Sequence, residues 1–194
     1  YIQEQADFLS RGNFIQDLNN DAYDDVIIAG FNKTHIFIGQ GMSSFAGQTL
    51  PIKPEVNVLS AGASYTQATL YFSDVNFDDK TDILVIGDGE MVIYSQYGNS
   101  QFTHKATRLA INESISGTDW WNKRDESGEQ LDQSDLEYRK LEELRDVNAD
   151  GIVDMVVRYT KASGVLDRVN DYEIFLGQKN KDALSYALKA DSVI

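Results

Sequence analysis

DVNADGIVD at residues 146–154 has two relatives in the same chain, DLNNDAYDD at 17–25 and DVNFDDKTD at 74–82. Each stretch places Asp, Asn, Asp and Asp at its positions 1, 3, 5 and 9. Each is followed directly by an apolar, strand-like run: VIIAG at 26–30, ILVIG at 83–87 and MVVRY at 155–159. The recurrence indicates an internal repeat, and the four oxygen-bearing side chains indicate a site for a hard cation.

Calcium is the cation that suits this spacing, because it takes about six to eight oxygen ligands. We expect the side chains at positions 1, 3, 5 and 9 and the backbone carbonyl at position 7 to bind one Ca²⁺ in each loop. The expected ligands are Asp17, Asn19, Asp21, Tyr23 and Asp25; Asp74, Asn76, Asp78, Lys80 and Asp82; and Asp146, Asn148, Asp150, Ile152 and Asp154.

The EF-hand does not explain these loops, because it needs a Glu at loop position 12 and a helix afterwards. Position 12 is Ile28, Val85 or Val157, and the following residues are β-branched. The alternative is a set of Asx-rich turns that hold no metal, since Asp and Asn also stabilise turns through their own backbone.

The three loops differ at position 6, which favours a residue that tolerates positive φ. Only the third loop has glycine there, Gly151, whereas the first has Ala22 and the second Asp79. Asp tolerates this conformation better than Ala. We therefore rank the third loop as the strongest candidate site and the first as the weakest.

The composition fits a packed globular chain, with 194 residues, 42% hydrophobic residues and a net charge of −14. This charge argues against nucleic acid or an anionic membrane surface as a partner. The absence of cysteine excludes disulfides and cysteine-based sites. There is no run of about 20 apolar residues and no visible signal peptide, and the opening YIQEQADFLS looks like a mature or excised segment.

Strand-like segments recur around each loop in the same order. A short strand leads in, at 13–16, 69–73 and 140–145, and the loop and its apolar strand follow. A third strand comes next, at 34–41, 90–98 and 171–178, and a weaker fourth at 55–60, 102–109 and 183–189. Four antiparallel strands per unit predict an all-β fold of propeller-like blades.

These units resemble the FG-GAP or VCBS repeat of integrin-alpha-like β-propellers, in which an aspartate-rich calcium loop precedes an apolar strand and an aromatic strand that ends in a Gly turn. The matching residues are DLNNDAYDDVIIAG…HIFIGQG, DVNFDDKTDILVIGDG…MVIYSQYG and DVNADGIVDMVVRY…YEIFLGQ. The resemblance implies calcium in the loop between the first and second strands of each blade. Ala22 and Asp79 depart from the glycine of the pattern.

The repeats are predicted at about 11–62, 63–112 and 137–194 of a single domain, 1–194, with a polar insertion at about 112–139. Propellers typically close with about four to eight blades. About three blades therefore predict an arc of a larger propeller, or an assembly that closes with partner chains. Ser134 and Glu137 have capping-box spacing, so a helix at about 135–143 competes with the lead-in strand.

Trp120 and Trp121 lie in the polar insertion, where paired aromatics suit sugar or peptide binding, although one Trp anchoring the loop is the simpler explanation. The two histidines, His35 and His104, are far apart in sequence and do not suggest a catalytic or zinc site. Repeated carboxylate clusters favour metal binding over catalysis. We therefore expect that the protein is not an enzyme.

The sequence predicts a calcium-binding, non-catalytic repeat domain of a secreted, periplasmic or cell-surface protein, because weak multi-carboxylate sites are useful where calcium is millimolar. Its expected partners are a protein or glycan ligand, with other blades or a partner chain completing the propeller. One alternative is an accessory module of a larger secreted enzyme or toxin-like protein. Another is a lectin-like sugar binder that uses Trp120 and Trp121.

Overall fold

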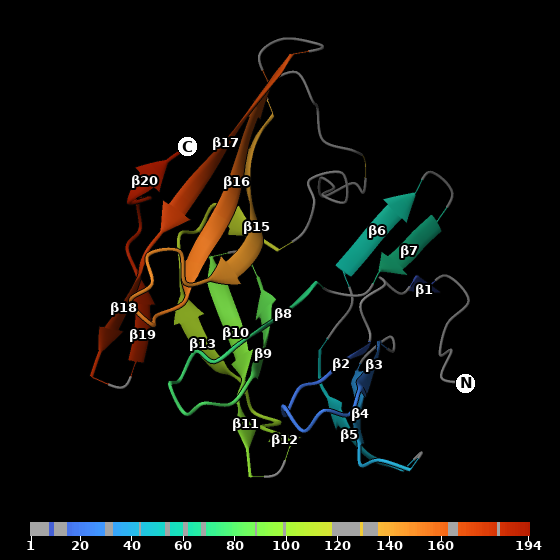
Figure 1. Ribbon diagram of the computed structural model, residues 1–194. Helices are drawn as coiled ribbons and strands as arrows, with labels where there is room; N and C mark the ends of the chain where they lie inside the picture. The colour runs from blue at the N-terminus through green and yellow to red at the C-terminus, as the bar shows by residue number, and fades with distance from the viewer. Residues whose placement is uncertain are drawn as a thin grey trace.

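The computed structural model confirms the all-β fold: every element among the described residues is a strand (Figure 1). No helix in this part of the chain is long and apolar enough to cross a membrane. The structure describes residues 8–9, 15–29, 33–42, 44–52, 55–59, 62–66, 69–87, 89–98, 100–117, 129, 136–162, 167–181 and 183–194.

Each acidic loop lies between the first two strands of its own antiparallel unit. The first unit is a sheet in the order β2 (Ile15–Gln16), β3 (Asp25–Ala29), β4 (Thr34–Gly39) and β5 (Phe45–Leu50). The second is a sheet of β8 (Leu70–Ser73), β9 (Asp82–Ile86), β10 (Glu90–Tyr94) and β13 (Thr107–Ala110). A short hairpin, β11 (Gln96–Tyr97) and β12 (Gln101–Phe102), extends the second unit.

The third unit has the longest strands. Its sheet runs β14 (Ile115–Ser116), β15 (Glu137–Arg145), β16 (Asp154–Ala162), β17 (Arg168–Phe175) and β20 (Ser192–Val193), with β14 parallel to β15. A hairpin of β18 (Gly177–Asn180) and β19 (Ala183–Tyr186) follows β17. A separate sheet holds β1 (Phe8–Leu9), β7 (Gly62–Thr66) and β6 (Glu55–Leu59).

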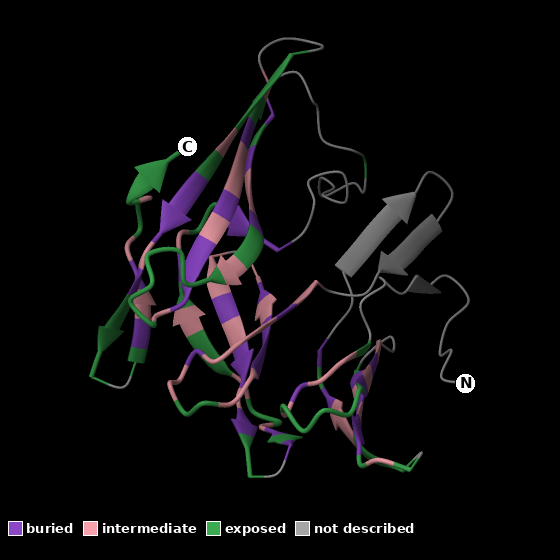
Figure 2. Ribbon diagram, in the orientation of Figure 1, coloured by how far each residue is buried: buried purple, intermediate pink, exposed green. Residues whose placement is uncertain are grey.

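Apolar residues alternate along the central strands and fill the spaces between units. One buried cluster joins the first and second units and includes Leu18, Ile27 and Phe102. A larger one joins the second and third units and includes Val75, Met155 and Tyr186 (Figure 2). The three units therefore pack against one another in chain order, and the described sheets do not form a closed ring.

The structure decides one alternative that the sequence left open and corrects one expectation. The helix at about 135–143 does not form from Leu136 onward, where β15 pairs along its length with β16 and bulges between Leu141 and Glu143. Strand pairing with sequence-distant partners overrides the local capping signal. Ser134 itself lies outside the described residues.

The predicted fourth strand is correct only in the second unit. There β13 overlaps the predicted range 102–109 and extends one residue beyond it. In the first unit β5 takes this place, and the segment predicted at 55–60 pairs with β7 instead. In the third unit β20 takes it, and β19 pairs with β18. A short alternating strand does not reveal its partner, because any exposed edge can accept it.

Candidate metal centres and the polar cleft

The three loops share one backbone path. In each, the fourth and sixth residues have positive φ: 57° and 70° at Asn20 and Ala22, 65° and 62° at Phe77 and Asp79, and 61° and 81° at Ala149 and Gly151. The left-handed conformation predicted at position 6 is therefore present in all three loops. The one at position 4 was missed, because Phe77 and Ala149 carry no sequence signal for it.

The first aspartate of each loop holds the turn together. In the first loop Asp17 accepts N–H bonds from Asp21 at 3.2 Å and from Ala22 at 2.9 Å. In the third loop Asp146 accepts the equivalent bonds from Asp150 at 3.2 Å and from Gly151 at 2.8 Å. The bond from Gly151 is the main cause that lowers the pKa of Asp146.

The second loop repeats this arrangement. Asp74 accepts from Asp78 at 3.2 Å and from Asp79 at 2.8 Å. Asp78 in turn accepts the N–H of Lys80 at 3.1 Å. The loops are therefore shaped by their own carboxylates, as Asx turns are.

The last aspartate of each loop, which we name the closing aspartate, has a different environment. Asp25, Asp82 and Asp154 are fully buried. Asp154 accepts one N–H from Val147, the second residue of its loop, and one from Gly177, beyond β17. These bonds, of 2.9 Å and 2.8 Å, tie the loop to the start of the following hairpin.

The other two closing aspartates make the same pair of bonds. Asp25 accepts from Leu18 at 2.7 Å and from Gly39 at 2.8 Å. Asp82 accepts from Val75 at 3.3 Å and from Gln96 at 2.9 Å. The sequence spacing identified these residues, but it gave no sign of this structural role, because the second donor lies 14 or 23 residues downstream.

Burial governs the electrostatics of two closing aspartates, Asp25 and Asp82. It raises the pKa of Asp25, and it raises the pKa of Asp82 to about 6. The backbone N–H bonds oppose this effect only in part. A cation close to such a carboxylate would favour the ionised form.

The donor chemistry of the loops fits a hard cation, because all the expected ligands are oxygens of Asp, Asn or backbone carbonyls. Within the described ranges, however, no three or more Asp, Glu, His or Cys side chains gather into a ready-made metal cluster. The loop carboxylates are instead engaged by backbone N–H groups. Calcium binding at the fifteen expected ligands therefore stays a prediction.

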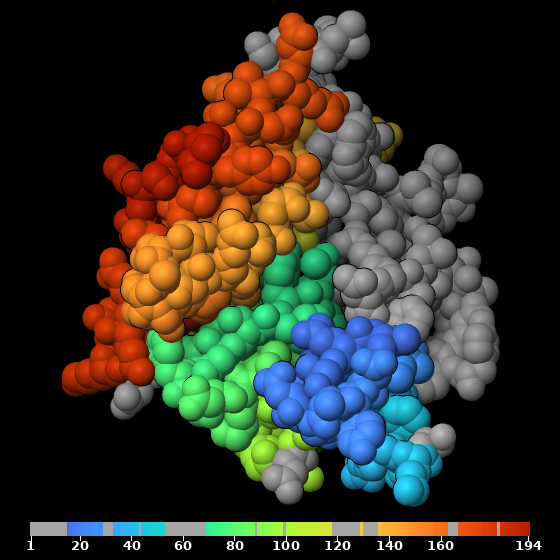
Figure 3. Space-filling model, in the orientation of Figure 1, coloured from blue at the N-terminus to red at the C-terminus, as the bar shows by residue number. Residues whose placement is uncertain are grey.

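The loops lie in series on one face of the molecule, coloured blue, green and orange in Figure 3. Each of the first two contacts the next unit. Asn19 donates to Ser100 Oγ at 2.7 Å, and the Gln96 amide donates to the Leu18 carbonyl at 3.2 Å. In the second loop, the Phe77 ring lies 4.0 Å below the Lys179 ammonium group.

Residues 17–85 match the family described as FG-GAP-like repeat. This part of the chain is similar to an FG-GAP-like repeat. The predicted resemblance is thereby confirmed for a range that contains the first two loops. No curated protein matches the chain. The third loop lies beyond the FG-GAP-like match, and its equivalence rests on the shared backbone angles and closing-aspartate bonds.

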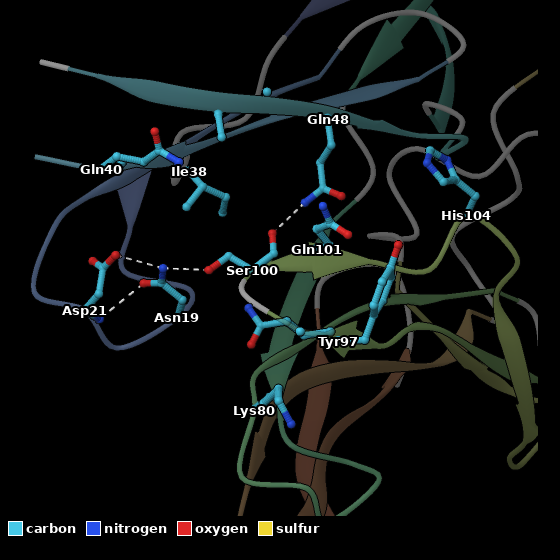
Figure 4. A pocket seen from close by; sticks show the side chains of 15 residues that line it. Asn19, Asp21, Ile38, Gln40, Gln48, Lys80, Tyr97, Ser100, Gln101 and His104 are labelled. Atoms are coloured by element: carbon cyan, nitrogen blue, oxygen red, sulfur yellow. Dashed lines mark hydrogen bonds between the residues drawn. The ribbon is translucent and has the colours of Figure 1, made fainter.

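A polar cleft of about 760 Å³ opens between the first and second units (Figure 4). Amide side chains dominate its lining: Asn19, Gln40, Gln48, Gln96 and Gln101. Gln48 links the two units, since its amide donates to the Ser100 carbonyl at 3.0 Å and accepts from the Phe102 N–H at 3.0 Å.

One side of the cleft carries the groups that remain available to a ligand. Tyr97, which is 49% exposed, stands near Gln101 and His104 (Figure 4). Sequence reasoning missed this cleft, because its walls come from two units far apart in the chain. Trp120 and Trp121, the residues predicted to bind a ligand, lie outside the described residues.

Proposed function

We propose that the chain is a calcium-binding, non-catalytic repeat domain of a secreted or cell-surface protein, and that it mediates adhesion through protein or glycan contacts. The observation that carries this proposal is the identical path of the three loops. Each presents oxygen donors at the same positions on a turn with two left-handed residues. Repetition of one donor set supports metal binding over catalysis, because catalytic groups have no reason to recur in every unit.

Calcium would have a structural role here. Each loop joins two strands, and its closing aspartate bonds to a backbone N–H at or just beyond the end of the third strand. An ion shared by these carboxylates would offset their mutual repulsion and pin the strands together. The millimolar calcium outside cells is the reason for the proposed compartment.

A calorimetric and thermal test addresses this proposal. Calcium titration should release or absorb heat, and the melting temperature should fall by several degrees after chelation. One site at about 100 times its Kd contributes about 2.7 kcal/mol. Asp150→Asn should weaken binding, whereas Asp167→Asn, which changes an exposed aspartate outside the loops, should not. An unchanged melting curve with chelator at neutral pH would refute calcium binding.

The architecture supports a further part of the proposal, that the units are blades of a propeller. The first two sheets have four antiparallel strands each, and successive units share buried clusters. This is how blades pack around a propeller. The described chain would then be an arc of about three blades.

A lectin-like function is the second candidate, and the cleft between the first two units favours it. Amides match sugar hydroxyls, because both donate and accept hydrogen bonds, and the exposed Tyr97 ring offers a face for a sugar ring. Binding on an array of neutral glycans should fall with Tyr97→Ala. Tyr172→Ala is the matched control, since Tyr172 is 46% exposed on β17. Absence of any glycan signal would eliminate this candidate.

A further inference from the structure

Each buried cluster between successive units includes the same two apolar positions. One is the second residue of the acidic loop, whose N–H bonds to the closing aspartate: Leu18, Val75 or Val147. The other is the aromatic strand partner of the second residue that bonds to the closing aspartate, and we name it the hairpin aromatic. The closing aspartate therefore marks both positions in every unit.

The hairpin aromatics are equivalent by register. The closing aspartates bond to the N–H of Gly39, Gln96 and Gly177. The strand partners of these three residues are Phe45, Phe102 and Tyr186 respectively. All three are aromatic, although the surrounding sequences differ.

Inside the chain the two positions share a buried cluster twice. Leu18 of the first unit and Phe102 of the second are both fully buried, in one cluster. Val75 of the second unit and Tyr186 of the third are 3% and 8% exposed, in the other cluster. In both cases the loop residue belongs to one unit and the aromatic to the next.

Among the described units, one loop residue and one hairpin aromatic have no counterpart from a neighbouring unit. The loop residue lies in the third unit and the aromatic in the first. Val147 in the third loop is 37% exposed, although its counterparts are buried. Phe45 in the first unit is 51% exposed, and Met42 beside it is fully exposed. The β4–β5 turn and the β15–β16 loop accordingly appear exposed in Figure 2.

The polar residues around Phe45 resemble those around Phe102. The hairpin that receives the first loop, SQYGNSQF at 95–102, has no charged residue, and neither has GQGMSSFAGQTL at 39–50. Asn19 donates to Ser100 in the internal contact. The third loop has Asn148 at the same position as Asn19, and the first hairpin is rich in serine and glutamine.

We propose that a second copy of this chain provides both missing counterparts, with Val147 of one copy against Phe45 of the other. The contact is head-to-tail, and it continues the interface that the chain already makes between its own units. The inference needs the repeat, but it does not need calcium in the loops.

Sedimentation velocity in calcium-containing buffer tests this contact across micromolar concentrations. The wild-type chain should self-associate, with a dimer as the expected species. Phe45→Ser and Val147→Ser should each weaken association by about tenfold or more, as loss of a buried apolar side chain implies. Tyr172→Ser, which removes an equally exposed aromatic elsewhere, should leave the dissociation constant within about twofold.

Mixing the two variants gives the decisive measurement. A Phe45→Ser copy retains Val147, and a Val147→Ser copy retains Phe45, so the mixture restores one of the two contacts. The mixture should associate more strongly than either variant alone. Circular dichroism verifies that both variants are folded.

Three results would overturn the proposal: a wild-type chain that stays monomeric, association that survives both substitutions, or variants that do not complement each other. A monomer that still gains thermal stability with calcium would leave the proposed function intact while rejecting the contact. Repeating the sedimentation measurement with chelator separates the two, because loss of calcium alone does not remove Phe45 or Val147.

Discussion

The first and third acidic loops have the same backbone but different surroundings. Leu18 in the first loop is fully buried against the second unit, whereas Val147 at the same position in the third loop is 37% exposed. Both loops nevertheless keep two left-handed residues and the same bonds to their first and closing aspartates. The comparison shows that the loops are shaped from within, whereas the neighbouring unit determines only what is buried around them.

The largest expected effect concerns the hairpin aromatics. Phe102→Ala should lower the free energy of unfolding by about 3–5 kcal/mol, because Phe102 fills the cluster beneath the first loop. Phe45→Ala should change it by no more than about 0.5 kcal/mol in the monomer, because Phe45 is half exposed. Urea unfolding at low protein concentration measures both. Equal losses in the free energy of unfolding would mean that a neighbouring unit does not stabilise Phe102 more than Phe45.

The closing aspartates come next. Asp25→Ala and Asp154→Ala should each cost about 2–4 kcal/mol, because each removes a buried carboxylate that accepts two backbone N–H bonds. If the loops are shaped from within, the two losses should agree within about 1 kcal/mol. Unfolding in chelator separates this effect from calcium binding. A much larger loss for Asp25 would show that the second unit helps to hold the first loop.

The smallest effects are expected at position 6. Gly151→Ala should cost about 1 kcal/mol, since Gly151 has φ of 81° with open space around its α-carbon. Ala22→Gly should stabilise the first loop by up to about 1 kcal/mol, because glycine relieves the left-handed strain but adds entropy to the unfolded chain. Thermal melts with matched buffers resolve such changes. A stabilising Gly151→Ala substitution would contradict the shared strain of the loops.

Much of the fold follows from the sequence because it is local. The lead-in strands, the apolar strands and the left-handed sixth residue are encoded within each stretch of nine residues and its flanks. The bonds of the closing aspartates are not local, since Asp154 bonds to Gly177, 23 residues downstream and beyond both β16 and β17. The cleft and the hairpin aromatics likewise depend on which unit lies beside which, and periodicity within one strand does not carry that information.

The sequence separation between hydrogen-bonded residues also predicts the order of folding. Bonds within a loop join residues no more than seven apart, such as Val147 and Asp154. Bonds between units are longer, spanning 52 residues from Gln48 to Ser100, 70 from Tyr71 to Leu141 and 81 from Asn19 to Ser100. Contacts that close short segments form early, because closing them costs little chain entropy, and long-range contacts form later. The acidic loops are therefore expected to act as early local nuclei, with docking between units as the slower, rate-limiting event.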